Sequence, residues 1–274
     1  MLLIVREGGE SVKAVLTTRY RNDILNFEGD SRCSQLVLGE VFLIYVGMDD
    51  TDNKDSRGTG RLARAVAAML AEKYQVWGVT RHQLLVDPRI PYTSHNSSNV
   101  VHLLIDGDVD LVAIADAAQA VMLADFQEGS DPGLCVARTI TPEIIDFGRR
   151  AKTELVDQAQ AREIAEHSGC ILRGLGGTEG GVIGALAGIG LAATGEDGRF
   201  VLVGRSRDLE GAQTVQAIIS CGIAQVRSTD GKILKEGLVE TGGKLRPALR
   251  EHQPILFVQQ PEDNSSIWLP VKLD

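Results

Sequence analysis

The sequence predicts a mixed α/β (α+β) fold with two α/β units and a small β-rich element at the C-terminal end. Three observations predict it. Segments with apolar residues at helical spacing alternate with short apolar runs, and each of these runs is flanked by residues typical of turns. Two loops that follow such runs are unusually acidic or glycine-rich. The chain has 274 residues, 43% of them hydrophobic and 24% charged, and is long enough for two domains.

The first α/β unit is expected over residues 44–127. Residues 1–43 fit the pattern poorly, and they are either a β-rich extension or a stretch included by an early start codon. Within the unit, Asp108 is expected to cap an alanine-rich helix that continues to Phe126. The other elements predicted from apolar period are strands at 41–46, 76–80 and 100–105 and a helix at 61–73.

The second α/β unit is expected over residues 131–221, after a linker from Gln127 to Pro132 that is rich in turn-forming residues. Its predicted elements are helices at 142–151, 156–168, 181–193 and 211–220 and strands at 170–172 and 200–203. Residues 222–274 show short apolar runs separated by Thr-Asp-Gly and Thr-Gly-Gly, which predicts a small β-rich element.

The first strand leads into the tetrad Asp49-Asp50-Thr51-Asp52. Three carboxylates so close together raise one another's pKa unless a cation lies between them. Mg²⁺ suits that place, because it binds oxygen ligands and retains several waters. The tetrad therefore predicts a Mg²⁺ site at a strand end, with Asp49, Asp50 and Asp52 as ligands and candidate catalytic groups. An acidic surface turn is the alternative interpretation.

A glycine-rich segment, residues 174–190, has six glycines among its first eleven positions. A strand, a glycine loop and a helix in this order form a phosphate cradle, because exposed N–H groups and a helix N-terminus both favour an anion. The spacing matches neither the dinucleotide fingerprint nor the Walker lysine motif. Gly184, Gly188 and Gly190 are also explained by close helix packing. The residues predicted to bind the phosphates of a cofactor are Gly174, Gly176, Gly177, Thr178, Gly180 and Gly181.

An extended segment, residues 80–96, lies between these loops and contains two prolines that stiffen its backbone. Arg81 and Arg89 are suited to bidentate contact with phosphates. His82 and His95 titrate near neutral pH, as proton carriers do, although a structural role is the alternative for each. The candidate substrate-binding residues are His82, Asp87, Arg89, Tyr92 and His95.

The net charge of −9 argues against nucleic acid as a partner of the isolated chain, since such binding normally needs a basic excess or stripe. Basic residues are dispersed, and only Arg57/Arg61/Arg64 and Arg205/Arg207 form local clusters. The four cysteines lack Cys-x-x-Cys spacing, which excludes a zinc ribbon. No apolar stretch is long enough for a membrane span and no signal peptide is recognisable, so a cytoplasmic protein is expected.

The three segments, in this order, resemble the archaeal tRNA-Ile agmatidine (2-agmatinylcytidine) synthetase family, whose members use ATP to attach agmatine to a wobble cytidine of an isoleucine tRNA. The family's kinase module has a strand leading into Gly-x-Asp-Asp-Thr-Asp, here at 47–52, and a segment similar to Arg-Leu-x-x-Asn-Pro-x-Ile-Pro, here around 82–91. Its ferredoxin-like module continues a phosphate loop into Gly-Ala-Leu-Ala-x-Ile-Gly, here at 184–190. The resemblance covers roughly residues 44–205.

The resemblance implies a kinase-like module at 44–127 that holds Mg²⁺ and a ferredoxin-like module at 131–221 that holds ATP. The sequence differs from the family's pattern in three respects. The phosphorylatable Gly-x-Cys-Thr-Thr segment is replaced by Gly-Thr-Gly-Arg at 58–61, and the Lys-Thr-Arg-Gly-Asn run by Thr-Ser-His-Asn-Ser at 93–97. The family's RNA-binding fold and zinc ribbon have no counterpart, because residues 221–274 are too short for both.

These features give three hypotheses for function. The first is an ATP- and Mg-dependent phosphotransferase or ligase that activates a carbonyl or amide oxygen of a small molecule, with Arg57, Arg81 or Arg89 offsetting the developing charge. The second is a nucleotide-binding regulatory or accessory protein without catalysis, motivated by the missing threonine segment. The third is modification of a tRNA cytidine with a separate RNA-binding partner. A partner protein or a homodimer is compatible with all three.

Overall fold

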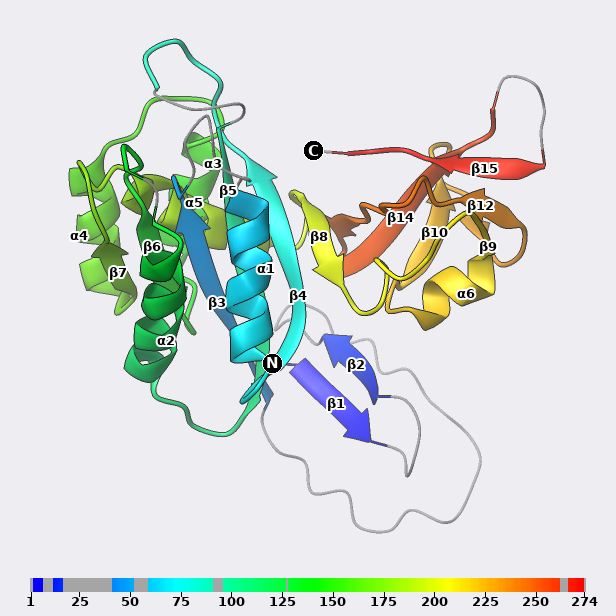
Figure 1. Ribbon diagram of the computed structural model, residues 1–274, viewed down its shortest axis with the longest axis horizontal. Coiled ribbons are helices and arrows are strands. Elements are labelled where there is room, and N and C mark those ends of the chain that lie inside the picture. The colour runs from blue at the N-terminus through cyan, green and yellow to red at the C-terminus, as the bar shows by residue number, and fades with distance from the viewer. Residues whose placement is uncertain are drawn as a thin grey trace.

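The computed structural model describes residues 2–6, 12–16, 41–51, 59–90, 96–126, 128–261 and 266–273. It confirms a mixed α/β architecture, in which a large sheet carries helices on both faces and continues into a C-terminal β unit (Figure 1). The helices are α1 (Thr59–Leu70), α2 (Leu111–Ala124), α3 (Pro142–Arg150), α4 (Gln158–Ser168), α5 (Gly181–Thr194) and α6 (Val215–Ser220). The strands are β1 (Leu2–Arg6), β2 (Val12–Leu16), β3 (Val41–Asp49), β4 (Gln75–Gln83), β5 (Ser97–Asp106), β6 (Gly133–Ala137), β7 (Ile171–Gly174), β8 (Arg199–Val203), β9 (Ala212–Thr214), β10 (Gln225–Ser228), β11 (Ile233–Leu234), β12 (Leu238–Glu240), β13 (Ala248–Arg250), β14 (Gln253–Gln259) and β15 (Ile267–Pro270).

The centre of the sheet is built from β3, α1, β4, β5, α2 and β6 in chain order. Its strands lie in the order β6-β3-β5-β4, and each neighbouring pair is antiparallel. This is the split β-α-β arrangement of ferredoxin-like folds. A ferredoxin-like module was predicted for residues 131–221, but those residues do not form a sheet of their own. The arrangement lies instead on residues 41–137.

The chain after β6 completes the same sheet. β7 pairs with β6 at one edge and β8 with β4 at the other, and α5 crosses one face between them. α1 and α2 pack on the opposite face, because successive residues of a strand point to opposite sides. The result is three layers, with α1 and α2 on one side of the sheet and α3, α4 and α5 on the other. None of the helices in the described ranges is long and apolar enough to cross a membrane.

Helix α5 approaches both the sheet and α3 closely. A Cβ atom added to Gly47 of β3 would lie 2.2 Å from the carbonyl oxygen of Ala185 in α5. A Cβ added to Gly190 of α5 would lie 2.1 Å from the carbonyl oxygen of Ile144 in α3. Real Cβ atoms do not come so near, so glycine is required where these backbones meet. The packing interpretation of the later glycines in this segment is confirmed.

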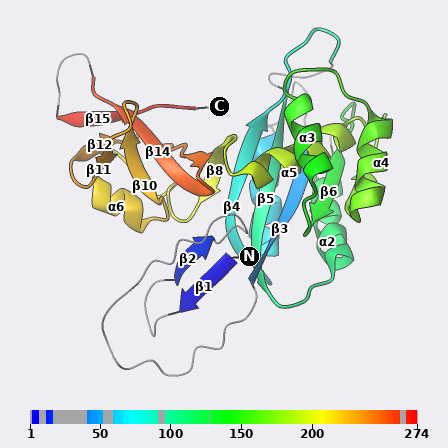
Figure 2. The ribbon, with the colours of Figure 1, turned by 180° about the vertical axis from the view of Figure 1, so that it is seen from behind.

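The C-terminal unit, the described residues of 204–273, contains β9 to β15 and α6, and its core also includes Phe200 and Val203 of β8. β8 connects it to the large sheet (Figures 1 and 2). Ala248 of β13 is the register partner of Arg199 in β8, and the N–H of Phe200 donates to the carbonyl oxygen of Pro247 at 2.7 Å. Short strands were predicted over residues 222–274, and the described residues there form β10 to β15, which β9 and α6 precede in the chain.

Two predicted helix starts are wrong. The N-cap of α2 is Asp110, whose carboxylate accepts hydrogen bonds from two N–H groups of the first turn at 2.9 and 3.3 Å. Asp108 lies two residues earlier and is outside the helix. The helix predicted at 211–220 begins only at Val215, because residues 212–214 form β9, which is paired with β12.

At the N-terminal end, β1 and β2 form an antiparallel hairpin. Leu2 of β1 is also the register partner of Val41 at the start of β3. The described part of residues 1–43 thus consists of the β1–β2 hairpin and the start of β3.

Candidate functional site

The described part of the acidic tetrad, residues 49–51, and the glycine loop lie at the same end of the sheet. Asp49 ends β3 and is the register partner of Gly133 in β6, which is in turn the partner of Gly174 at the end of β7. Neighbouring strands lie about 4.8 Å apart, so the start of the glycine loop is about 10 Å from Asp49. Two motifs that are far apart in the sequence thus end side by side.

Asp49 makes the closest contact between the two motifs. Its side chain faces α5, because the neighbouring Met48 belongs to the core under α1. A Cβ atom on Gly184, in the first turns of α5, would lie 1.6 Å from Asp49 Oδ2. A carboxylate therefore lies against the N-terminal part of a helix, where the helix dipole stabilises negative charge.

Asp50 and Thr51 turn the chain out of β3. Asp50 has a left-handed backbone, with φ of 49°, which Asp adopts more readily than most residues. Thr51 is only 6% exposed, and its Oγ1 has no hydrogen-bond partner among the described residues. A buried hydroxyl without a partner marks a position where a polar group or ion would be accommodated.

The glycine loop holds an internal carboxylate. Asp131 accepts hydrogen bonds from the N–H of Thr178 at 2.6 Å and from its hydroxyl at 2.7 Å. Gly177 has φ of 58°, and a Cβ there would lie 1.8 Å from Asp131 Oδ1. Gly180 is different, since the nearest atom to an added Cβ is 3.6 Å away. The donors predicted to bind phosphate oxygens at Thr178 are therefore engaged by a side chain from the predicted linker.

The chemistry of the donor set at the strand end suits a Mg²⁺ ion. Asp49 and Asp50 offer carboxylate oxygens, and Mg²⁺ at nucleotide sites is usually held by one or two carboxylates together with phosphates and waters. Within the described residues, no group of three or more His, Cys, Asp or Glu side chains is placed to hold a metal ion. Asp52, the third predicted ligand, and Arg57 lie outside the described residues.

His82 does not lie where a substrate could reach it. The side chain is wholly buried, and its Nδ1 lies 2.9 Å from a carboxylate oxygen of Asp197, which also pairs with Lys152. Its Nε2 lies 2.7 Å from Thr80 Oγ1, which is 2.8 Å from His102 Nε2. Burial lowers the pKa of His82, and it lowers the pKa of His102 to about 3. The prediction that His82 binds substrate is wrong, because it belongs to a buried polar network.

Asp87 and Arg89 pair with one another. Two guanidinium nitrogens of Arg89 donate to the carboxylate at 2.8 Å, and these bonds lower the pKa of Asp87 to about 2. The Arg89 side chain is 70% exposed, so this bidentate pair fixes the shape of a surface loop. Tyr92 and His95 lie outside the described residues.

Arg81 is placed next to another arginine that the sequence did not single out. Its Nε donates to Ser97 Oγ at 2.9 Å, and its register partner across the β4–β8 pair is Arg199. Arg199 was missed because nothing in the sequence indicates that β8 pairs with β4. Asp131 was missed because it falls in the predicted linker, where a turn residue has a sufficient explanation.

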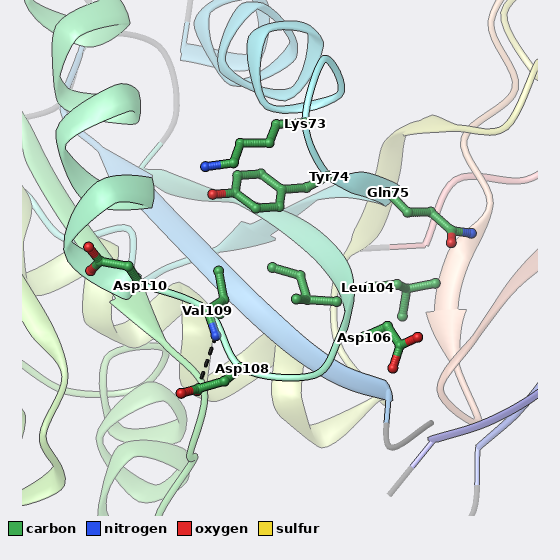
Figure 3. A pocket seen from close by; sticks show the side chains of 9 residues that line it. Lys73, Tyr74, Gln75, Leu104, Asp106, Asp108, Val109 and Asp110 are labelled. Atoms are coloured by element: carbon green, nitrogen blue, oxygen red, sulfur yellow. Dashed lines mark hydrogen bonds between the residues drawn. The ribbon is translucent and has the colours of Figure 1, made fainter. Parts of the chain in front are cut away.

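A pocket of about 390 Å³ lies at the other end of the sheet, away from the two motifs (Figure 3). Lys73 and Tyr74, from the turn after α1, line one side of it. Asp106 at the end of β5 and Asp108 and Asp110 from the turn before α2 line the other. The pocket includes none of the predicted site residues.

Comparison with known proteins gives a partial structural likeness. No family model and no curated protein matches the sequence. A crystal structure of TiaS in complex with an isoleucine tRNA and ATP matches with a TM-score of 0.47 and 22% identity, over 54% of this chain and 36% of that chain. A tRNA fluorescent labeling enzyme matches with a TM-score of 0.46 and 22% identity, over 54% and 36%. Apo TiaS, an agmatidine synthetase for isoleucine tRNA, matches with a TM-score of 0.45 and 20% identity, over 54% and 35%.

These likenesses extend over about half of this chain. The chain spans only about a third of the length of those proteins, 35–36%. Another of the matching structures holds TiaS with an isoleucine tRNA, AMPCPP and agmatine.

Proposed function

We propose that this protein is an ATP- and Mg-dependent phosphotransferase or ligase that acts on a small molecule. The supporting observation is the contact between the two motifs, in which the Asp49 carboxylate lies against Gly184 in the helix that follows the glycine loop. Such a pair of motifs supplies oxygen ligands for Mg²⁺ on one side and N–H donors for phosphate on the other. Residues 44–127 act as the kinase-like module in this proposal, and residues 131–221 contribute the phosphate loop.

The side chains of the site have distinct roles in this proposal. Asp49, Asp50 and Asp52 would hold Mg²⁺, which when bound neutralises charge on the phosphate oxygens. The Asp131 carboxylate uses the donors of Thr178 that a phosphate would need. Two anions share such a loop only with a cation between them, so binding of phosphate here depends on binding of the metal.

A small-molecule substrate is favoured over RNA by the net charge of −9. The second candidate is a nucleotide-binding regulatory or accessory protein without catalysis. The sequence Gly-Thr-Gly-Arg at 58–61, in place of the family's threonine pair, favours it. The third candidate function is modification of a tRNA cytidine, which requires a separate partner protein that binds the RNA.

Asp50→Asn tests the proposal, because Asn also adopts the left-handed backbone that this position requires. We expect the variant to fold and its affinity for Mg-ATP, measured by calorimetry, to fall about tenfold or more, which corresponds to about 1.4 kcal/mol. Asp146→Asn, at an exposed position of α3, is the control with the same change in charge. Unchanged affinity in a folded Asp50→Asn variant would contradict the metal assignment.

Turnover of ATP in the presence of candidate substrates separates the three functions. Turnover with a small metabolite supports the enzyme. Binding of Mg-ATP without turnover indicates the regulatory protein, and RNA that co-purifies with the chain indicates the tRNA function.

A further inference from the structure

Five partly buried arginines gather where α1, β4, β8 and the C-terminal unit meet. They come from five separate segments of the sequence, and we refer to them as the arginine cluster. Its members are Arg64, Arg81, Arg199, Arg207 and Arg246. In Figure 1, β8 lies between α1 with β4 on one side and the C-terminal unit on the other.

The sheet places the centre of the cluster on the face that α1 covers. Met48, Asn99, Arg81 and Arg199 are successive register partners across β3, β5, β4 and β8, so their side chains share one face. Met48 identifies that face, because it belongs to the core under α1. Asp49 points to the opposite face, and the sheet therefore separates the arginine cluster from the glycine loop.

The positive charges of the cluster act on one another. Burial lowers the pKa of Arg199 to about 10, and the charges of Arg81 and Arg246 contribute to that shift. Burial also lowers the pKa of Arg246, with the charges of Arg207, Arg64 and Arg81 adding to the effect. The pKa of Arg64 is lowered by burial and then by the charge of Arg207. Partly desolvated guanidinium groups that repel one another favour an anion between them.

Carbonyl oxygens accept hydrogen bonds from two members of the cluster, Arg64 and Arg207. Arg64 Nη1 donates to the carbonyl oxygen of Gly60 at 2.7 Å, and Arg207 Nη1 to that of Val201 at 3.3 Å. Arg246 Nη1 is buried and has no hydrogen-bond partner within the described part of the chain. Among the residues that the structure describes, no carboxylate forms an ion pair with any of these three arginines.

A buried amide adds a further polar group at the same place. Asn99 is 1% exposed, and its Oδ1 has no hydrogen-bond partner among the described residues. A Cβ atom on Gly60 would lie 3.8 Å both from this oxygen and from Arg64 Nη1, so the amide and the guanidinium are neighbours. Rotation of the amide by half a turn would present its NH₂ group, a donor, in the same direction.

We propose that the arginine cluster is a binding site for phosphate oxygens, either of a free or nucleotide polyphosphate or of a nucleic-acid backbone. Guanidinium groups suit this ligand because their donors match phosphate oxygens in pairs. The site lies about 14 Å from Asp49, a distance of three strand spacings. The net charge of −9 does not oppose it, since five of the 28 lysines and arginines are concentrated at one place.

The test uses the full chain, inorganic triphosphate and EDTA, so that no metal-dependent site contributes. We expect triphosphate to raise the Tm of the wild-type protein, because a ligand that binds the folded state stabilises it. Arg246→Gln and Arg207→Gln should each weaken binding at least tenfold by calorimetry. Arg149→Gln is the control, since Arg149 is exposed on α3 and the change in charge is the same.

A second arm replaces triphosphate with an oligouridylate of about twelve nucleotides. The logarithm of its affinity should fall with the logarithm of salt concentration by about 0.7 for each phosphate neutralised, which gives a slope of about −3.5 for five arginines. Binding with that slope identifies a nucleic-acid backbone as the source of the phosphate. Binding of triphosphate alone identifies a polyphosphate.

Two results would overturn the proposal: neither probe binds the wild-type protein, or both arginine variants bind as tightly as Arg149→Gln. The proposal does not rest on the ATP- and Mg-dependent activity, because the probes are tested without metal. Loss of Mg-ATP binding with triphosphate binding intact would refute that activity and leave the arginine cluster in place.

Discussion

Replacement of Asp131 should change stability and nucleotide affinity in opposite directions. Its carboxylate accepts two hydrogen bonds from Thr178, at 2.6 and 2.7 Å. Bonds to a charged group contribute about 1.5–3 kcal/mol each when buried, and less at an exposed loop, so Asp131→Ala should lower the free energy of unfolding by about 1–3 kcal/mol. A phosphate about 4 Å from the carboxylate is repelled by about 1–4 kcal/mol. Removal of the charge should therefore raise the affinity for metal-free ATP by about tenfold or more.

The measurements are urea denaturation for stability and calorimetry with ATP in EDTA for affinity. Asp131→Asn isolates the charge, because its amide oxygen still accepts the bond from the Thr178 N–H. It should lose less stability than Asp131→Ala and gain a similar affinity. With Mg²⁺ the gain should shrink, since the carboxylate is then no longer opposed to the phosphate. Equal affinity of wild type, Asp131→Asn and the Asp146→Asn control in EDTA would refute phosphate binding by the loop.

Two further results are expected. Gly180→Ala should change the free energy of unfolding by no more than about 0.5 kcal/mol, because φ is −58° and the added Cβ is 3.6 Å from its nearest neighbour, while affinity for Mg-ATP falls. Gly177→Ala should in addition lower the free energy of unfolding by about 1–3 kcal/mol, because its Cβ clashes with Asp131. If Gly180→Ala binds Mg-ATP as tightly as the wild type, the loop does not bind phosphate. An unfolded histidine binds its proton near pH 6.5 and buried His102 near pH 3, so the unfolded state takes up more protons in between. The free energy of unfolding should therefore fall by about 2 kcal/mol as the pH is lowered from 6.5 to 5. Urea titrations of His102→Phe should show a weaker dependence of stability on pH. If the dependence is the same as in the wild type, groups other than His102 cause it.

Most helices and strands of the large sheet could be predicted, because their apolar period is a local property of the sequence. The order of the strands could not. The pairing of β3 with β6 brings residues of both predicted units into one ladder, and no feature of either segment indicates its partner. The short strand at 212–214 was missed for the same reason, since its conformation depends on pairing with β12 rather than on its own residues.

The site was predicted in part. The acidic and glycine motifs are local patterns, and Asp49 of the first lies against Gly184 of the second at one end of the sheet. His82 was taken as an accessible residue of the extended segment at 80–96. It lies on β4 two positions after Thr80, at the phase that faces the interior, where a polar residue is paired rather than accessible. Arg64, Arg81 and Arg207 were noted separately in the sequence, but nothing there indicated that they meet Arg199 and Arg246, because the arginine cluster exists only through strand pairing and the position of the C-terminal unit.

The close approach of α5 to its neighbours divides the glycines of this chain into those that the fold requires and those that another residue could replace without changing the fold. At Gly47 and Gly190 a side chain would meet a carbonyl oxygen at 2.2 and 2.1 Å, so descendants that keep the fold should keep glycine there whatever their activity. At Gly180 the backbone is ordinary and the space is open, so only selection on the loop's ligand would hold glycine in place. Among divergent relatives, glycine at the first two positions thus traces inheritance of the architecture. Substitution of Gly180 in a group of relatives would indicate that phosphate binding has been lost in that group.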